Sequence, residues 1–108
     1  MDPNDAELVK RVLAGDRAAF GYLVDRHRLE AQVLARRMLS DSFEAEDVTQ
    51  EAFLQAFLGL RDLRFFDRFG SWLLGIVVNL CKMRLRARGH WHPADVVWRA
   101  RGGWFHAG

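Results

Sequence analysis

The chain has 108 residues, enough for one compact domain with a single core but not for two. Half of the residues are hydrophobic and 28% are charged, which excludes a chain that is disordered over its whole length, and no apolar run approaches the roughly 20 residues of a membrane-spanning helix. The formal net charge is only +2, and the single cysteine excludes an intrachain disulfide. The acidic N-terminus lacks an apolar secretory core, so we expect a cytoplasmic protein without membrane insertion.

The first 40 residues predict two helices. A cap at Asn4 or Asp5 starts a short helix that ends just before Gly15, a residue suited to the left-handed backbone beyond a helix. Asp16 is expected to cap a second, longer helix that runs to about residue 39, because apolar residues recur there at steps of three and four.

The rest of the chain predicts two more helices and a tail. A third helix is expected from residue 43 or 44 to residue 60, and an irregular connector at residues 61–67 leads to a fourth helix that ends at residue 88. The expected core residues of this fourth helix are Phe69, Trp72, Leu73, Ile76, Leu80 and Met83. The sequence therefore predicts an all-α bundle of about four helices over residues 1–89, followed by an irregular, tryptophan-rich C-terminal tail at residues 90–108.

Charge is distributed unevenly along the chain. Residues 41–60 hold five acids and no Lys or Arg, whereas residues 61–88 hold seven bases and two acids. Adjacent segments of opposite charge favour two surfaces for two partners, although chance clustering on solvated faces is the alternative.

The third helix carries an unusual outward face. At about 100° per residue, one side of the helix is apolar and the other gathers a mixed set: Asp47, Gln50, Glu51, Leu54 and Leu58. The two leucines are four residues apart and therefore touch. Acids beside leucines are typical of a protein-docking surface; the alternative is that the first helix covers the leucines.

The connector and the fourth helix combine cations, aromatic rings and a side-chain amide. The residues opposite the core stripe of the fourth helix are Ser71, Gly75, Val78, Asn79, Lys82 and Arg86. The connector and the start of the helix add Arg64, Phe65, Phe66 and Arg68. Such a set is suited to single-stranded nucleic acid, whose phosphates need cations and whose bases stack on rings. In the alternative interpretation the two phenylalanines cap the core, which we expect for at least one of them.

Signals for enzymatic chemistry are weak. The third helix has no histidine near its acids that would complete a metal site. His90 and His92 form an incidental pair in the tail, His27 lies on an apolar stripe and is interpreted as a core histidine, and Cys81 is expected to be structural. We therefore expect no catalytic residues, no bound metal and no cofactor, and keep an acid-cluster metalloenzyme only as a minor alternative.

Three strings occur in an order and spacing that resemble region 2 of bacterial RNA polymerase sigma factors, above all the extracytoplasmic-function type. They are GDRAAF at residues 15–20, AEDVTQEAF at 45–53 and SWLLGIVVN at 71–79. The resemblance covers residues 5–88. It implies a helical domain that binds the RNA polymerase core through the clamp helices of the largest subunit and recognises and melts the minus-ten promoter element by binding its non-template strand.

The resemblance also implies which residues serve each partner. For the polymerase they are Asp47, Gln50, Glu51, Phe53 and Phe57, with Leu54 among them, and the outward-face argument above adds Leu58. For DNA they are Arg64, Phe65, Phe66, Arg68, Ser71, Asn79, Lys82 and Arg86. A flipped base would occupy a pocket near Asn79, and phosphate contacts would offset the cost of unstacking it.

This chain departs from the family pattern in three respects. Gly75 stands where a larger residue such as arginine is common, Met83 stands where Asp or Asn is usual, and residues 90–108 are too few to encode the second, helix-turn-helix domain. These departures leave one alternative open: a sigma-like module that binds the polymerase or an anti-sigma factor without recognising a promoter.

Overall fold

The computed structural model describes residues 2–89, which form four α-helices and two short 3₁₀ turns, with no strand within that range. The α-helices are α1 (Asp5–Leu13), α2 (Ala18–Leu39), α3 (Ser42–Leu58) and α4 (Phe69–Ala87). The 3₁₀ turns η1 (Leu60–Asp62) and η2 (Phe66–Arg68) make up the connector between α3 and α4. The all-α fold predicted from the sequence is confirmed, whereas the expected tail, with Trp91, His90 and His92, lies outside the described residues.

Local side-chain chemistry sets the helix ends. The side-chain oxygen of Asn4 accepts a hydrogen bond from the backbone N–H of Glu7 at 2.9 Å, and Asp41 caps α3 by accepting from the N–H groups of Phe43 and Glu44. The cap expected from Asp16 is wrong, since the N-cap of α2 is Arg17 and makes no side-chain cap bond. The backbone oxygen of Asp16 accepts from the N–H of Ala19 instead.

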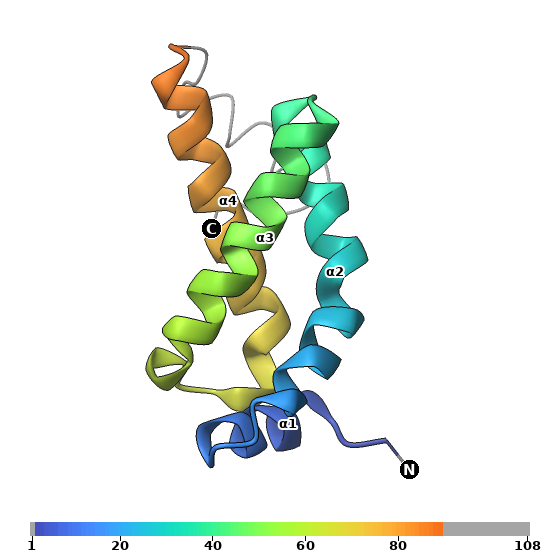
Figure 1. Ribbon diagram of the computed structural model, residues 1–108. Helices are drawn as coiled ribbons and strands as arrows, with labels where there is room; N and C mark the ends of the chain where they lie inside the picture. The colour runs from blue at the N-terminus through green and yellow to red at the C-terminus, as the bar shows by residue number, and fades with distance from the viewer. Residues whose placement is uncertain (1, 90–108) are drawn as a thin grey trace.

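Three long helices lie side by side and the short α1 crosses one end of the bundle (Figure 1). The helix α2 packs against each of the other three, so the core lies between α2, α3 and α4. The rings of Phe20, Phe57 and Phe69 meet there edge to face, with the centroid of Phe20 5.2 Å from that of Phe57 and 6.0 Å from that of Phe69. Because these rings come from α2, α3 and α4, they hold the three long helices together.

His27 ties α1 to the bundle. Its Nε2 lies 2.7 Å from a carboxylate oxygen of Asp5, and its ring centroid lies 5.4 Å from that of Phe69. The side chain keeps only 16% of its surface exposed. The interpretation of His27 as a histidine packed and hydrogen-bonded at the core is confirmed.

The buried surface of α4 is wider than the sequence predicts. The fully buried line runs through Leu73, Val77 and Cys81 rather than toward Met83, whose side chain is 63% exposed, and Val78, predicted to face outward, is buried. Both expectations are wrong because α4 contacts α2 on one side and α3 on another, so more than one stripe of the helix is covered.

Candidate functional site

The outward face of α3 is open. Asp47, Gln50 and Glu51 are exposed, and the side chains of Leu54 and Leu58 are 57% and 71% exposed. The opposite side of the helix is sealed by residues that are at most 2% exposed: Ala45, Val48, Thr49, Ala52 and Ala56. The alternative in which the first helix covers the leucines is therefore wrong.

Two aromatic residues assigned to the same face lie deeper. Phe53 is buried in the core, and Phe57 is half-buried with its ring against Phe20. They therefore present less surface to a partner than the two exposed leucines do. Their apolar character was visible in the sequence, but their depth depends on how α3 packs in the bundle.

A chain of amide and carboxylate groups orders the acidic end of α3. Gln32 of α2 donates a hydrogen bond to one carboxylate oxygen of Glu46 at 2.9 Å, and Gln50 donates to the other at 3.4 Å. Glu46 is thereby shared between two helices, which positions the Gln50 side chain relative to α2.

The connector presents one aromatic ring and buries another. Phe65 is 63% exposed, between the exposed Arg64 and Arg68, whereas Phe66 packs against the core. Buried Leu60 and Leu63 anchor the segment from below. The expectation that at least one of the two phenylalanines belongs to the core is confirmed, and Phe65 is the ring available for stacking.

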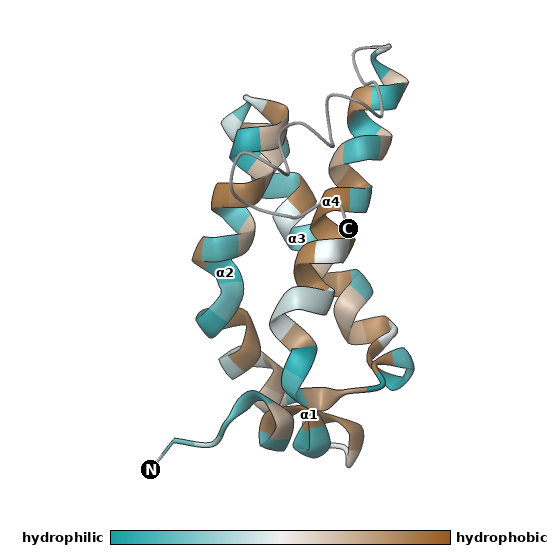
Figure 2. Ribbon diagram, turned by 180° about the vertical axis from the view of Figure 1, so that it is seen from behind, coloured by the Kyte–Doolittle hydropathy of each residue, from teal (hydrophilic) through white to brown (hydrophobic). Residues whose placement is uncertain are grey.

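The exposed side of α4 continues from the connector. The hydroxyl of Ser71 donates to the backbone oxygen of Arg68 at 3.2 Å, which joins the two segments. Asn79 and Arg86 are exposed and Lys82 is partly exposed; hydrophilic residues gather toward the C-terminal end of α4 (Figure 2). Ser71 and Arg86 are 15 residues apart, so at 1.5 Å per residue they span about 22 Å of the helix axis.

Met83 is a candidate contact that sequence reasoning missed. It lies four residues after Asn79 and three before Arg86, so one helical turn separates it from each. With 63% of its side chain exposed, it adds an apolar group to this face. The sequence predicted Met83 to be a core residue of the fourth helix, and only the packing of α4 against α2 and α3 shows that its side chain lies outside the core.

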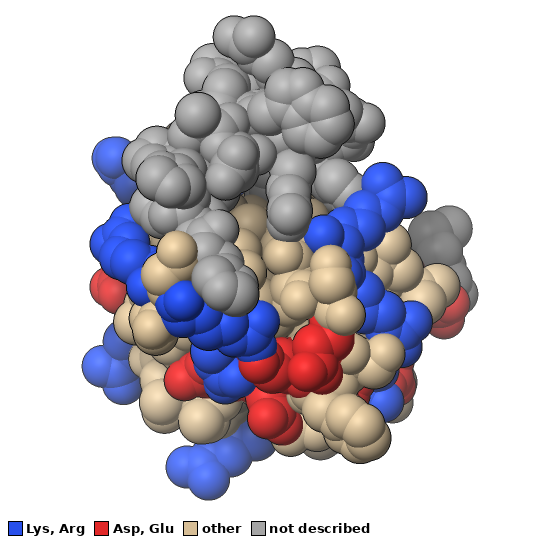
Figure 3. All heavy atoms as spheres, turned by 90° about the horizontal axis from the view of Figure 1, so that it is seen from above, with Lys and Arg blue, Asp and Glu red and all other residues tan. Residues whose placement is uncertain are grey.

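The two charged segments meet at the end of the bundle where α2 turns into α3. In this view acidic and basic side chains lie next to one another (Figure 3). Arg88, from the basic segment, forms an ion pair with Glu44, from the acidic one. Part of the charge separation seen along the chain is therefore neutralised within the fold.

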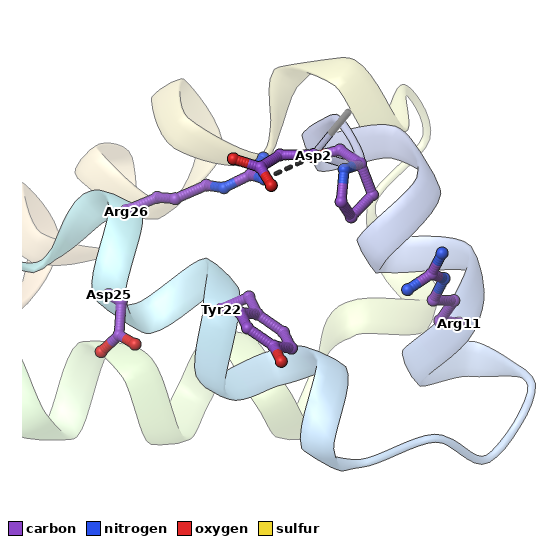
Figure 4. A pocket seen from close by; sticks show the side chains of 6 residues that line it. Asp2, Arg11, Tyr22, Asp25 and Arg26 are labelled. Atoms are coloured by element: carbon purple, nitrogen blue, oxygen red, sulfur yellow. Dashed lines mark hydrogen bonds between the residues drawn. The ribbon is translucent and has the colours of Figure 1, made fainter.

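A mixed-charge hollow lies at the opposite end of the bundle. It is lined by residues of the N-terminal segment, α1 and α2, including Asp2, Arg11, Tyr22 and Asp25 (Figure 4). Arg26 crosses it, donating a hydrogen bond to the backbone oxygen of Pro3 and pairing with Asp5 at 3.1 Å. These bonds fasten the N-terminal segment, and the hollow shares no residue with the faces of α3 and α4.

Residues 2–89 contain neither a metal-binding cluster nor a helix that could span a membrane. No group of three or more His, Cys, Asp or Glu side chains there is arranged to hold a metal ion. None of the four helices combines the length and the apolar character that crossing a bilayer requires.

The sequence model of the protein family described as sigma-70 region 2 matches residues 23–90 of the chain. The chain belongs to the sigma-70 region 2 family. The matched segment takes in the exposed face of α3, the connector and α4, and it excludes α1. The sigma region 2 resemblance read from three short strings is thereby confirmed over the part of the chain that holds both candidate faces.

Named relatives agree with this family. The chain is 40% identical over 93 residues to the RNA polymerase sigma-H factor of Pseudomonas aeruginosa, a match that covers 86% of this chain and 48% of that protein. It is 43% identical over 90 residues to the ECF RNA polymerase sigma factor SigM of Mycobacterium tuberculosis, a match that covers 83% of this chain and 45% of that protein. It is 36% identical over 80 residues to the ECF RNA polymerase sigma factor SigW of Bacillus subtilis, a match that covers 74% of this chain and 43% of that protein. The chain thus spans about half the length of these relatives.

Proposed function

We propose that this sigma region 2 chain acts in transcription initiation by binding two partners on two faces. The α3 face docks on the RNA polymerase core through the clamp helices of its largest subunit. The connector and α4 bind the non-template strand of the minus-ten promoter element and hold it open. The catalytic chemistry belongs to the polymerase, and an anti-sigma factor would compete for the same faces.

The polymerase half of the proposal rests on the α3 face. Two exposed leucines four residues apart, on the same face as Asp47 and Glu51, have the composition of an interface in which apolar contact gives affinity and charge gives orientation. This exposed pair on a helix whose other side is sealed is the observation that carries the function.

The DNA half rests on three exposed groups of the connector and α4. Phe65 offers a ring for base stacking, Asn79 an amide for a base edge, and Arg68 a cation for phosphate. The hydrogen bond between Ser71 and Arg68 keeps the connector in register with α4. Flipping a base costs a few kcal/mol, which stacking on Phe65 and the phosphate contacts would offset.

Paired variants separate the two halves. Gln50→Ala with Glu51→Ala is expected to weaken binding to core RNA polymerase at least tenfold, measured by biolayer interferometry, and to leave binding of single-stranded DNA within twofold. Asn79→Ala with Lys82→Ala is expected to do the reverse. Glu7→Ala and Lys10→Ala, exposed substitutions on α1, serve as matched controls for the loss of an acid or a cation.

A preference for particular DNA sequences distinguishes promoter recognition from docking on the polymerase alone. The complex of the chain with core polymerase is mixed with a randomised single-stranded DNA pool, and the bound fraction is sequenced. Enrichment of a short motif that Asn79→Ala abolishes supports the proposal. Polymerase binding without any enriched motif favours the sigma-like interaction module, and polymerase binding that ignores the Gln50 and Glu51 changes refutes the α3 assignment.

A further inference from the structure

A shallow groove of about 270 Å³ lies where the end of α1 meets the end of α3. Val12 and Leu13 of α1 form one wall, and Phe57 and Leu58 of α3 form the other. Leu13 is 40% exposed and Leu58 is 71% exposed. The groove therefore offers apolar side chains to a partner, at the end of the bundle where α1 crosses (Figure 1).

The polar lining of this groove has one sign of charge. Arg17, from the turn before α2, and Arg61, from η1, both line it, and no acid does. Both arginines are exposed, and within residues 2–89 neither side chain makes an ion pair or a hydrogen bond. An apolar hollow beside two such cations is complementary to an apolar side chain next to a carboxylate.

The groove is continuous with the α3 face, because Leu58 belongs to both. Asp47 lies eleven residues before Leu58, so the two are about 16 Å apart along the helix axis. Passing from the start of α3 to the groove, a partner would meet acids, then leucines, then arginines. A surface ordered in this way has a direction and fixes which way round a partner lies.

We propose that the groove is a second anchor for the polymerase segment that docks on α3. The segment carries, in order, a basic group opposite Asp47 and Glu51, apolar side chains over Leu54 and Leu58, and an apolar side chain with a carboxylate between Arg17 and Arg61. This inference rests on the proposed polymerase docking and adds the orientation and the charge order of the partner. Leu13 and Arg17 lie outside the segment matched by sigma-70 region 2.

Charge reversal tests the anchor. Arg17→Glu with Arg61→Glu is expected to weaken binding to core RNA polymerase at least tenfold, since two attractive contacts become repulsive. The control, Lys10→Glu with Arg28→Glu, makes the same change in net charge at exposed positions outside the groove and is expected to stay within twofold of the unmodified chain. Circular dichroism monitors the fold of each variant.

Cross-linking identifies the occupant independently of folding stability. The photo-reactive residue p-benzoylphenylalanine is placed at position 13, inside the groove, and at position 22, which is exposed on α2 outside it. Position 13 is expected to cross-link a polymerase peptide with an Asp or Glu within a few residues of the linked site, and position 22 is not. A linked peptide without an acid overturns the proposed charge order.

The outcomes separate this inference from the function beneath it. If Arg17→Glu with Arg61→Glu binds like its control while Gln50→Ala with Glu51→Ala still weakens binding, the groove is no anchor and the α3 docking stands. If neither pair changes the affinity, the docking proposal fails and the anchor fails with it.

Discussion

Cys81 lies on the inner side of α4 with no exposed surface. Burial raises the pKa of its thiol from the ordinary value of 9.0 to about 12, and the nearby Arg84 guanidinium offsets part of that rise. Because the thiolate is the reactive form, the folded protein keeps this sulfur inert, in agreement with the structural role expected from its mid-helix position.

This pKa predicts both slow labelling and a pH dependence. At pH 8 iodoacetamide is expected to modify Cys81 only after the chain is unfolded in denaturant. Between pH 9 and pH 12 the unfolded chain releases the thiol proton while the native chain keeps it, so the free energy of unfolding falls as pH rises. Chemical denaturation at pH 8 and pH 10 checks the sign: Cys81→Ala is expected to lose less stability over that interval than the unmodified chain.

At the scale of elements, two glycines of α4 have opposite surroundings. A Cβ at Gly70 would lie 2.9 Å from Cε1 of His27, whereas one at Gly75 would meet nothing within 4 Å. The His27 ring cannot move aside freely, because it is bonded to Asp5 and packed against Phe69. Gly70 thus permits the close contact between α2 and the start of α4, and Gly75 has no such packing role.

Alanine substitutions are expected to separate these roles. Gly75→Ala stabilises the chain by up to about 1 kcal/mol through helix propensity, and Gly70→Ala destabilises it by about 1–3 kcal/mol through overpacking. Thermal unfolding followed by circular dichroism measures both. In a double-mutant cycle, Gly70→Ala combined with His27→Ala is expected to lose less stability than the sum of the two single losses, because the clash between the new Cβ and the ring is then absent. A Gly70→Ala variant as stable as the unmodified chain would show that the His27 ring moves aside without a loss of stability.

For the whole molecule, the net charge of +2 conceals the local charge that DNA would meet. Arg64 and Arg68 are exposed on the connector, and Lys82 and Arg86 follow along α4. The ion pair between Arg88 and Glu44 neutralises one cation of the basic segment within the fold. Single-strand affinity should therefore depend on salt through a few cations rather than on the total charge.

The salt dependence of single-stranded DNA binding measures how many phosphates these cations contact. Each phosphate contact contributes about −0.7 to the slope of log K against log salt for a single strand. Arg68→Ala is expected to reduce the steepness of the slope by about that amount in fluorescence anisotropy titrations from 50 to 300 mM salt, concentrations at which such slopes develop. Lys10→Ala on α1 should leave the slope unchanged. An unaltered slope for Arg68→Ala would remove this residue from the phosphate contacts.

The sequence by itself determined the helices and the α3 face. Capping at Asn4 and Asp41 is local chemistry, and the expected ends of α3 and α4 agree with the observed ones within two residues. The outward residues of α3 follow from a 3.6-residue period on a helix with one sealed side. The helix ends and the outward face of α3 both depend on residues only a few positions apart, and the sequence displays that spacing directly.

Tertiary packing decided the rest. Met83 is exposed and Val78 is buried because α4 touches two helices at once, and a helical wheel cannot say where those helices lie. The groove between α1 and α3 joins Leu13, Arg17 and Arg61, whose proximity requires the chain to fold back on itself. Contacts between residues more than 40 positions apart are set by the balance of burial over the whole core, and no local pattern encodes them.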